Sequence, residues 1–160
     1  MSKRLRIQTD MAFDSAGTTT DITLTPTTER FLDTLTLELT NRGEKVLVQG
    51  VFAISIPPIT AVATGEIFAQ VKFYRDADQT NLAYQVNQTL LATGVAIVAP
   101  GTPASIHQVP VQFEEVPPLK VTEDTVNYYV TITVFNSGLA ITAGDIVLTQ
   151  YSIVAQEIAQ

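Results

Sequence analysis

Period-two alternation across residues 45–56 constrains the fold of this chain more than any other feature. In the stretch KVLVQGVFAISI, every even position from Val46 to Ile56 is apolar or glycine. That period indicates a pleated strand with one buried face. Three odd positions, Leu47, Val51 and Ala53, are apolar as well, which a strand with one fully solvated face does not need. A second surface that faces another subunit would explain them.

Similar strand-like stretches follow one another along the chain, separated by Gly or Pro, and none shows a convincing 3.6-residue period. Pro110 marks one stretch as interrupted or at a sheet edge, because proline has no N–H for the ladder. The last two stretches form the clearest pair. The expected strands are residues 4–9, 30–40, 45–56, 66–74, 82–91, 95–98, 106–113, 126–135 and 146–158. This spacing predicts an all-β fold, an antiparallel two-sheet sandwich, with a jelly roll preferred over an immunoglobulin-like arrangement.

The length of the chain favours a single core. A chain of 160 residues fits one domain. Asp10 to Gly17 is predicted to be a loop, and it leads into a threonine-rich stretch. We therefore predict an N-terminal arm over residues 1–20, either exchanged between copies or mobile, and one β-sandwich domain over residues 21–160.

Charge is divided unevenly along the chain. Residues 1–75 carry eight basic and eight acidic side chains, whereas residues 76–160 carry Lys120 against eight acids, so the net charge is −7. A basic start and an acidic second half can attract one another between subunits. The interface residues predicted on this ground are Lys3, Arg4, Arg6, Glu114, Glu115, Glu123 and Asp124. The simpler alternative is that the surface charge only keeps the protein in solution. The sequence has no basic stripe, which argues against nucleic acid as a partner.

Cysteine is absent from the chain, which excludes disulfides, thiolate nucleophiles and cysteine-ligated zinc. The basic N-terminus precedes no apolar run of signal-peptide length, and no later stretch is long enough for a membrane span. We therefore expect synthesis in the cytoplasm without a signal peptide and no membrane insertion. An external location after cell lysis, on a spore surface or in a virion, is compatible with this.

Candidate catalytic groups are few. His107 is the sole histidine, and Ser105, two residues away on the same predicted strand, lies in no Gly-x-Ser-x-Gly elbow. Glu114 and Glu115 are neighbours on a strand, so they point to opposite faces and do not converge on one bond. The chain is therefore expected to be no enzyme and to have no catalytic residue.

Two further groups of residues suggest ligands only weakly. Asp76 and Asp78 form the one oxygen-ligand cluster suited to calcium, but the glycine and the distal glutamate of an EF-hand are missing. We expect an ordinary polar hairpin tip there, with no metal and no cofactor. A set of aromatic residues would form a sugar platform if several shared one exposed face, although core packing is the commoner role. These are Phe68, Tyr74, Tyr84, Tyr128, Tyr129, Phe135 and Tyr151.

Two segments in the last third of the chain carry a family resemblance. Residues 143–148, AGDIVL, follow a tyrosine-rich strand at residues 128–134, YYVTITV. Together they resemble the closing strands of tumour-necrosis-factor/C1q-like jelly rolls. The resemblance implies compact trimers and, for some members, a place on bacterial spores without a secretion signal. The cysteines of several spore-coat components are missing here.

These observations favour a structural protein that self-assembles through sandwich faces and edges into a homo-oligomer, filament or surface layer. Its partners would be copies of itself. The alternative is a carbohydrate- or receptor-binding β module, such as a virion decoration or fibre-tip domain, which would add a glycan as partner.

Overall fold

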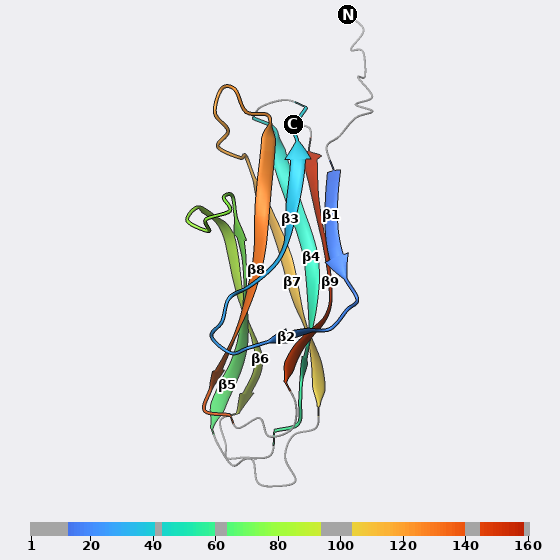
Figure 1. The fold of residues 1–160 in the computed structure, drawn as a ribbon, viewed down its shortest axis with the longest axis vertical. Coiled ribbons are helices and arrows are strands. Elements are labelled where there is room, and N and C mark those ends of the chain that lie inside the picture. The colour runs from blue at the N-terminus through green and yellow to red at the C-terminus, as the bar shows by residue number, and fades with distance from the viewer. Residues whose placement is uncertain (1–12, 41–42, 60–63, 94–103, 140–144, 159–160) are drawn as a thin grey trace, which may run out of the picture.

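The computed structural model describes residues 13–40, 43–59, 64–93, 104–139 and 145–158. Within these ranges nine strands form two antiparallel sheets packed face to face (Figure 1), which confirms the predicted all-β sandwich. None of the described residues forms a helix that is long and apolar enough to cross a membrane. The strands are β1 (Phe13–Thr18), β2 (Ile22–Leu24), β3 (Arg30–Glu38), β4 (Lys45–Ile56), β5 (Gly65–Tyr74), β6 (Leu82–Thr93), β7 (Ser105–Glu115), β8 (Thr125–Ser137) and β9 (Ile146–Ile158).

The strand pairing is nested in the manner of a jelly roll. β1 and β2 pair with β9, β3 pairs with β8, β4 with β7, and β5 with β6. This nesting gives sheet A the order β1-β9-β4-β7, with β2 also beside β9, and sheet B the order β3-β8-β5-β6. An immunoglobulin-like sandwich groups its strands differently, so the order favours the jelly roll.

Alternating apolar residues explain the core between the sheets. In β4, Val46, Val48, Phe52 and Ile54 point inward and are fully buried, in agreement with the predicted alternation. They join one continuous core with inward residues of both sheets. Strands β4 and β9 begin and end at the predicted residues, because their apolar alternation runs the whole length of each strand.

Polar contacts close the side of the sandwich on which β1 lies beside β3. The Thr36 amide donates a hydrogen bond to Asp14 Oδ2 at 2.7 Å. Thr40 donates from both its amide and its hydroxyl to the buried carboxylate of Glu157, each at 2.8 Å. These contacts connect the edges of the two sheets.

Aromatic rings close the opposite side, between the edge strands β6 and β7. Tyr84 of β6 stacks on Phe113 of β7 with ring centroids 4.5 Å apart. Phe73 and Tyr128 meet the same Phe113 ring edge-on at 5.2 and 5.9 Å. Side-chain contacts therefore close this side of the sandwich, since no backbone hydrogen bonds pair β6 with β7 within the described residues.

The predicted loop at Asp10–Gly17 is wrong for residues 13–17, which belong to β1 and pair with β9. The sequence of β1, FDSAGT, has no apolar alternation, so nothing in the pattern indicates a strand. Gly17 permits the close pairing, because a Cβ there would lie 2.8 Å from the carbonyl oxygen of Tyr151. The predicted arm over residues 1–20 thus overlaps a strand of sheet A. Residues 1–12, with the predicted strand at 4–9, lie outside the described residues.

The clear pair predicted at the end of the chain is split between the sheets. β8 lies in sheet B between β3 and β5, whereas β9 lies in sheet A between β1 and β4. The chain crosses the sandwich between them, as jelly-roll nesting requires. Pro110 lies in β7, an edge strand, as its missing N–H predicts. The predicted strand at residues 95–98 falls outside the described residues.

Candidate functional site

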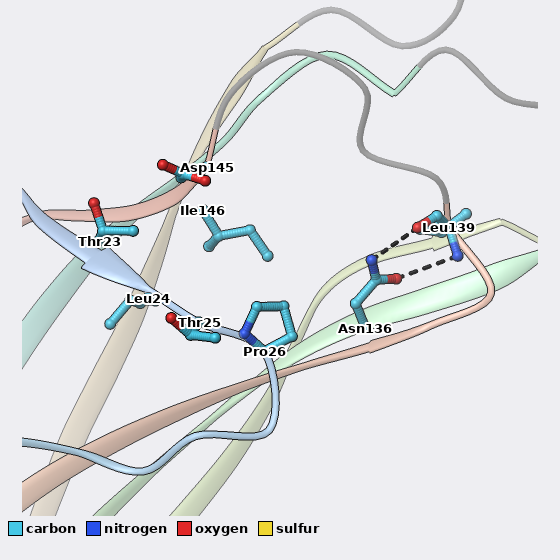
Figure 2. Close-up of a pocket in the computed structure, with 8 residues that line it drawn as sticks. All are labelled: Thr23, Leu24, Thr25, Pro26, Asn136, Leu139, Asp145 and Ile146. Atoms are coloured by element: carbon cyan, nitrogen blue, oxygen red, sulfur yellow. Dashed lines mark hydrogen bonds between the residues drawn. The ribbon is translucent and has the colours of Figure 1, made fainter.

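A pocket of about 420 Å³ opens where β2 lies near the end of β8 and the start of β9 (Figure 2). Both the nitrogen and the oxygen of the Asn136 side-chain amide form hydrogen bonds with Leu139. Nδ2 donates to the Leu139 carbonyl oxygen at 2.8 Å, and Oδ1 accepts from the Leu139 N–H at 3.2 Å. Asp145 is the sole ionisable residue among the described residues of the lining. The lining residues are Thr23, Leu24, Thr25, Pro26, Asn136, Leu139, Asp145 and Ile146. Among the described lining residues, Asp145 has no second acid or base beside it to form an acid–base pair.

Ser105 and His107 lie on the same side of β7, with Ser105 Oγ 2.8 Å from His107 Nε2. Residues two apart share one face of a strand, so the strand itself accounts for the contact. A catalytic triad also needs a group that orients the histidine. Within the described residues no carboxylate hydrogen bonds to this ring. Among the described residues the pair therefore lacks the third group of a triad.

Asp76 and Asp78 lie at the tip of the β5–β6 hairpin, as predicted. The Asp76 carboxylate accepts hydrogen bonds from the Thr80 hydroxyl, the Thr80 amide at 3.1 Å and the Asn81 amide at 2.7 Å. These donors, the Thr80 hydroxyl foremost, hold the pKa of Asp76 below its ordinary value. The carboxylate caps its own loop, and the described ranges contain no group of three or more potential metal-ligating acids, histidines or cysteines.

The four acidic residues predicted for an interface lie at one end of the sandwich, where β7 ends and β8 begins (Figure 1). They are Glu114, Glu115, Glu123 and Asp124. Across sheet A, Glu114 lies in the same row as Phe13, the first residue of β1. The basic partners predicted for them, Lys3, Arg4 and Arg6, lie outside the described residues.

Glu115 differs from the other three because it is only partly exposed and its carboxylate binds residues of the opposite sheet. Arg75 Nε donates to Glu115 Oε1 at 3.1 Å, and Arg75 Nη2 donates to Oε2. The hydroxyl of the buried Tyr128 donates to Oε1 at 2.8 Å. The bond to Glu115 raises the pKa of Arg75, and burial raises the pKa of Tyr128. Since Arg75 follows β5 in sheet B and Glu115 ends β7 in sheet A, this network joins the sheets.

A second pocket, of about 360 Å³, lies beside this network. Arg75 lines it, but its guanidinium is already paired with Glu115 and also donates to Asn81 Oδ1 at 3.0 Å. Lys120, another lining residue, forms an ion pair with Glu123 at 3.5 Å. Both cations in the lining therefore have acidic partners, which leaves little net charge for an anionic ligand.

The outer face of sheet A carries no charge over most of its described length. Lys45 and Glu114 stand at one end of it, 3.7 Å apart. Beyond them the outward positions hold amide, hydroxyl and small apolar side chains, including Val51, which is 36% exposed. We call this surface the neutral face. It comprises Gln49, Val51, Ala53, Ser55, Ile106, Gln108, Pro110, Gln112, Val147, Ser152 and Val154.

The outer face of sheet B is partly covered by its own chain. Glu29, from the β2–β3 connection, accepts hydrogen bonds from Thr131 at 2.5 Å and from Tyr74 at 3.1 Å. Lys72 lies 3.5 Å from the same carboxylate. This contact helps to explain why Thr131, on an outward position of β8, is fully buried.

A small aromatic surface lies further along the outer face of sheet B. Phe68 and Phe135 stack with ring centroids 4.6 Å apart. Beside Phe68 is a shallow pocket of about 190 Å³, where the Thr89 hydroxyl donates to Glu66 Oε1 at 2.7 Å. Of the aromatic residues predicted for a sugar platform, Tyr128 and Tyr151 are instead buried in the core. The lining residues are Glu66, Phe68, Asn87, Gln88 and Thr89.

One of these features was missed from the sequence, and another was predicted only in part. The inter-sheet network joins Arg75, Glu115 and Tyr128 from distant parts of the chain, and no local pattern connects them. The neutral face had a signal, because Leu47, Val51 and Ala53 gave β4 a second apolar side. The positions from β7 and β9 that complete the face became visible only with the strand order.

Comparisons with known proteins show no family. No protein-family model and no curated protein matches the chain. A chain of the T13 viral particle of infectious bursal disease virus matches with a TM-score of 0.39 and 11% identity, over 91% of this chain and 35% of that one. A chain of T=1 particles derived from the virus gives 0.34 and 11%, over 91% and 36%. A VP2 subviral particle gives 0.23 and 4%, over 92% and 41%.

This chain spans about a third of the length of the first two viral chains. Identities of 4–11% and TM-scores below 0.5 do not support any inference about the function of this chain. None of the three structures is described as a tumour-necrosis-factor/C1q-like protein, so that resemblance stays a prediction.

Proposed function

We propose that the chain is a non-enzymatic structural protein whose copies associate through the neutral face of sheet A. The observation that carries this proposal is the absence of charge from that face in a chain of net charge −7. The centres of protein interfaces are depleted in charged residues. Apolar side chains such as Val51 and Ile106, 36% and 69% exposed, would be buried there.

A second copy is the occupant that this charge distribution favours. Two identical chains each carry −7, so they repel unless they meet where charge is absent. Two sheets pack about 10 Å apart when their facing side chains are small or apolar. Val51, Ala53 and Val154 fit this requirement, and Gln49 and Gln112 can form hydrogen bonds across such a contact.

The basic N-terminal segment is a further proposed contact. Lys3, Arg4 and Arg6 precede β1, which starts at the end of the sandwich that holds the exposed acids Glu114 and Glu123. Six residues lie between Arg6 and Phe13, so a fully extended chain would span about 23–25 Å from one to the other. The segment would hold an assembly together by pairing with acids of a neighbouring copy.

A particle shell is the assembly that we propose, by analogy with the use of jelly rolls in viral capsids. A closed contact between copies gives an oligomer or shell, and a contact that does not close gives a filament or layer. The proposal includes an external role after cell lysis. We do not propose a place on the spore surface, because only the sequence resemblance supports that location.

The test compares Val51→Glu with Val121→Glu by sedimentation velocity and negative-stain electron microscopy. Both variants add one negative charge, but Val121 lies away from the neutral face and is 83% exposed. We expect assemblies of the unaltered protein and of Val121→Glu, and their loss in Val51→Glu. Monomers of the unaltered protein at high concentration, or equal assembly of both variants, would overturn the proposal.

A second candidate function is carbohydrate binding at the Phe68–Phe135 surface. An aromatic ring next to the Glu66 carboxylate and the Asn87 amide is a suitable combination for the apolar face and the hydroxyls of a sugar. Titration with monosaccharides and disaccharides, followed by NMR shifts of Phe68 and Thr89, tests it. Shifts that Phe68→Ala abolishes would favour the glycan function, and unchanged spectra would remove it.

A further inference from the structure

Three of the four sheet edges carry features that resist pairing with another chain. β7 has Pro110 at its centre and acidic residues at its end. β3 carries Arg30, Asp33 and Glu38, and its Thr36 amide is already bonded to Asp14 across the sandwich. β1 and β2 are short, at six and three residues. Proline, charge and short length are the usual means by which proteins protect exposed strands.

The fourth edge, β6, has none of these three features, and it pairs regularly with β5 from Tyr84 to Thr89, between two register shifts. Its twelve residues, LAYQVNQTLLAT, include no charge, no proline and no glycine. β6 ends the order of sheet B and pairs only with β5 among the described strands. Within the described residues no backbone hydrogen bond reaches its outer edge. Among the described residues, the N–H and C=O groups along this outer edge therefore have no backbone partner, and another strand can pair with them.

We infer that β6 pairs in antiparallel fashion with β6 of a second copy, around a two-fold axis. The inference deepens the proposed self-association by adding an edge contact to the neutral face. Two four-stranded sheets would become one continuous sheet of eight strands. An antiparallel edge is complementary to itself, since each strand offers alternating donors and acceptors to the other.

The lack of charge favours β6 itself as the occupant. In a two-fold pairing, each residue near the axis lies opposite its own counterpart, so any charge there would meet the same charge. β6 avoids this repulsion although the whole chain carries −7. Gln85, Asn87 and Gln88 lie near the middle of β6. If two copies of β6 overlap over their full length, the two-fold axis passes through this region. Amide side chains stack well between paired strands.

The edge is also held in place for pairing. Tyr84 stacks on Phe113 of β7, which fixes β6 against the other sheet. Asn87 Oδ1 accepts from Gln70 Nε2 at 3.0 Å and from Gln85 Nε2 at 3.3 Å, so a polar ladder already crosses β5 and β6. A second β6 would extend this ladder without rearrangement of the fold.

Single cysteines in this cysteine-free chain test the inference directly. Variants Gln85→Cys, Asn87→Cys, Gln88→Cys and Thr89→Cys are oxidised mildly, and disulfide-linked dimers are measured on non-reducing gels. Opposite residues of antiparallel strands are about 4.5–5.5 Å apart, within disulfide range. Each step away from the axis separates the two cysteines by a further two residues, about 6.8 Å.

We expect dimers to peak at one position and to fall severalfold on either side of it. Val121→Cys, in the exposed β7–β8 connection, measures cross-linking by random collision. Gln49→Cys reports on the neutral face. A flat profile at the level of Val121→Cys would overturn the β6 pairing. If Gln49→Cys cross-links while β6 does not, the proposed function stands without the edge contact, and if neither does, both fail.

A charge pair gives a second test that needs no oxidation. Asn87→Lys and Asn87→Glu each place like charges near the axis, so each alone should lower the dimer fraction in sedimentation velocity. An equal mixture should restore it, because lysine then faces glutamate. A mixture that stays as monomeric as either variant would contradict the two-fold register.

Discussion

Gly50 lies at an inward position of β4, where its neighbours on the same face are large apolar residues. A Cβ there would lie 2.9 Å from the carbonyl oxygen of Ser152 and 3.3 Å from Ile153 Cα. Both atoms belong to the backbone of β9, which the sheet holds in place. We expect Gly50→Ala to lower the free energy of unfolding by about 1–3 kcal/mol in urea denaturation. Gln49→Ala, at the exposed neighbouring position, should change it by less than about 0.5 kcal/mol, and equal effects would contradict the crowding.

The Thr80 hydroxyl is the largest of several contributions that lower the pKa of Asp76. It donates to the carboxylate and stabilises the charged form, which lowers the pKa below the ordinary value of 3.8. This stabilisation is present above the ordinary pKa and is lost as the pH falls through the lowered one. We expect Thr80→Val to raise the Asp76 pKa in an NMR titration, and Thr80→Ser to leave it low. A pKa that is the same in both variants would mean that the hydroxyl makes no such bond in solution.

At the scale of elements, the contribution of β1 to stability can be measured with two N-terminal truncations, one that keeps β1 and one that removes it. Removal of residues 1–12 leaves β1 paired with β9, whereas removal of residues 1–18 strips β1 and its Asp14–Thr36 bond from the sandwich. We expect the first truncation to unfold at the same urea concentration as the whole chain. The second should lose at least about 2 kcal/mol, since each net hydrogen bond contributes about 0.5–1.5 kcal/mol. Equal stability of the two would mean that β1 adds nothing to the fold.

The strands were predictable wherever side chains alternate, and the partners of the strands were not. β4 was predictable to the residue because Val46 to Ile56 repeats every two positions, but β1 is held by backbone pairing and by the small Gly17. The split of β8 and β9 between sheets follows from pairings with β3 and β4, far away in the sequence. The same holds for the candidate surfaces, because the neutral face and the free edge of β6 exist only once the strand order is known.

At the scale of the whole molecule, salt distinguishes the two kinds of contact proposed between copies. Each copy carries −7, so copies repel at low ionic strength, where the screening length is about 30 Å at 0.01 M, against about 3 Å at 1 M. Contacts through the neutral face and β6 involve no charge, so screening should strengthen them. A contact between Lys3, Arg4 or Arg6 and the acidic end should weaken instead.

We therefore expect the assembled fraction in sedimentation velocity to rise between 0.01 and 1 M NaCl. The chain without residues 1–12 keeps both uncharged contacts but loses three basic and one acidic residue, so it carries −9 and should show at least as large a rise. Dissociation by salt in the whole chain, together with a monomeric truncated chain, would place the main contact in the N-terminal segment. In that case the acidic end of the sandwich, and not the neutral face, would be the surface on which assembly depends.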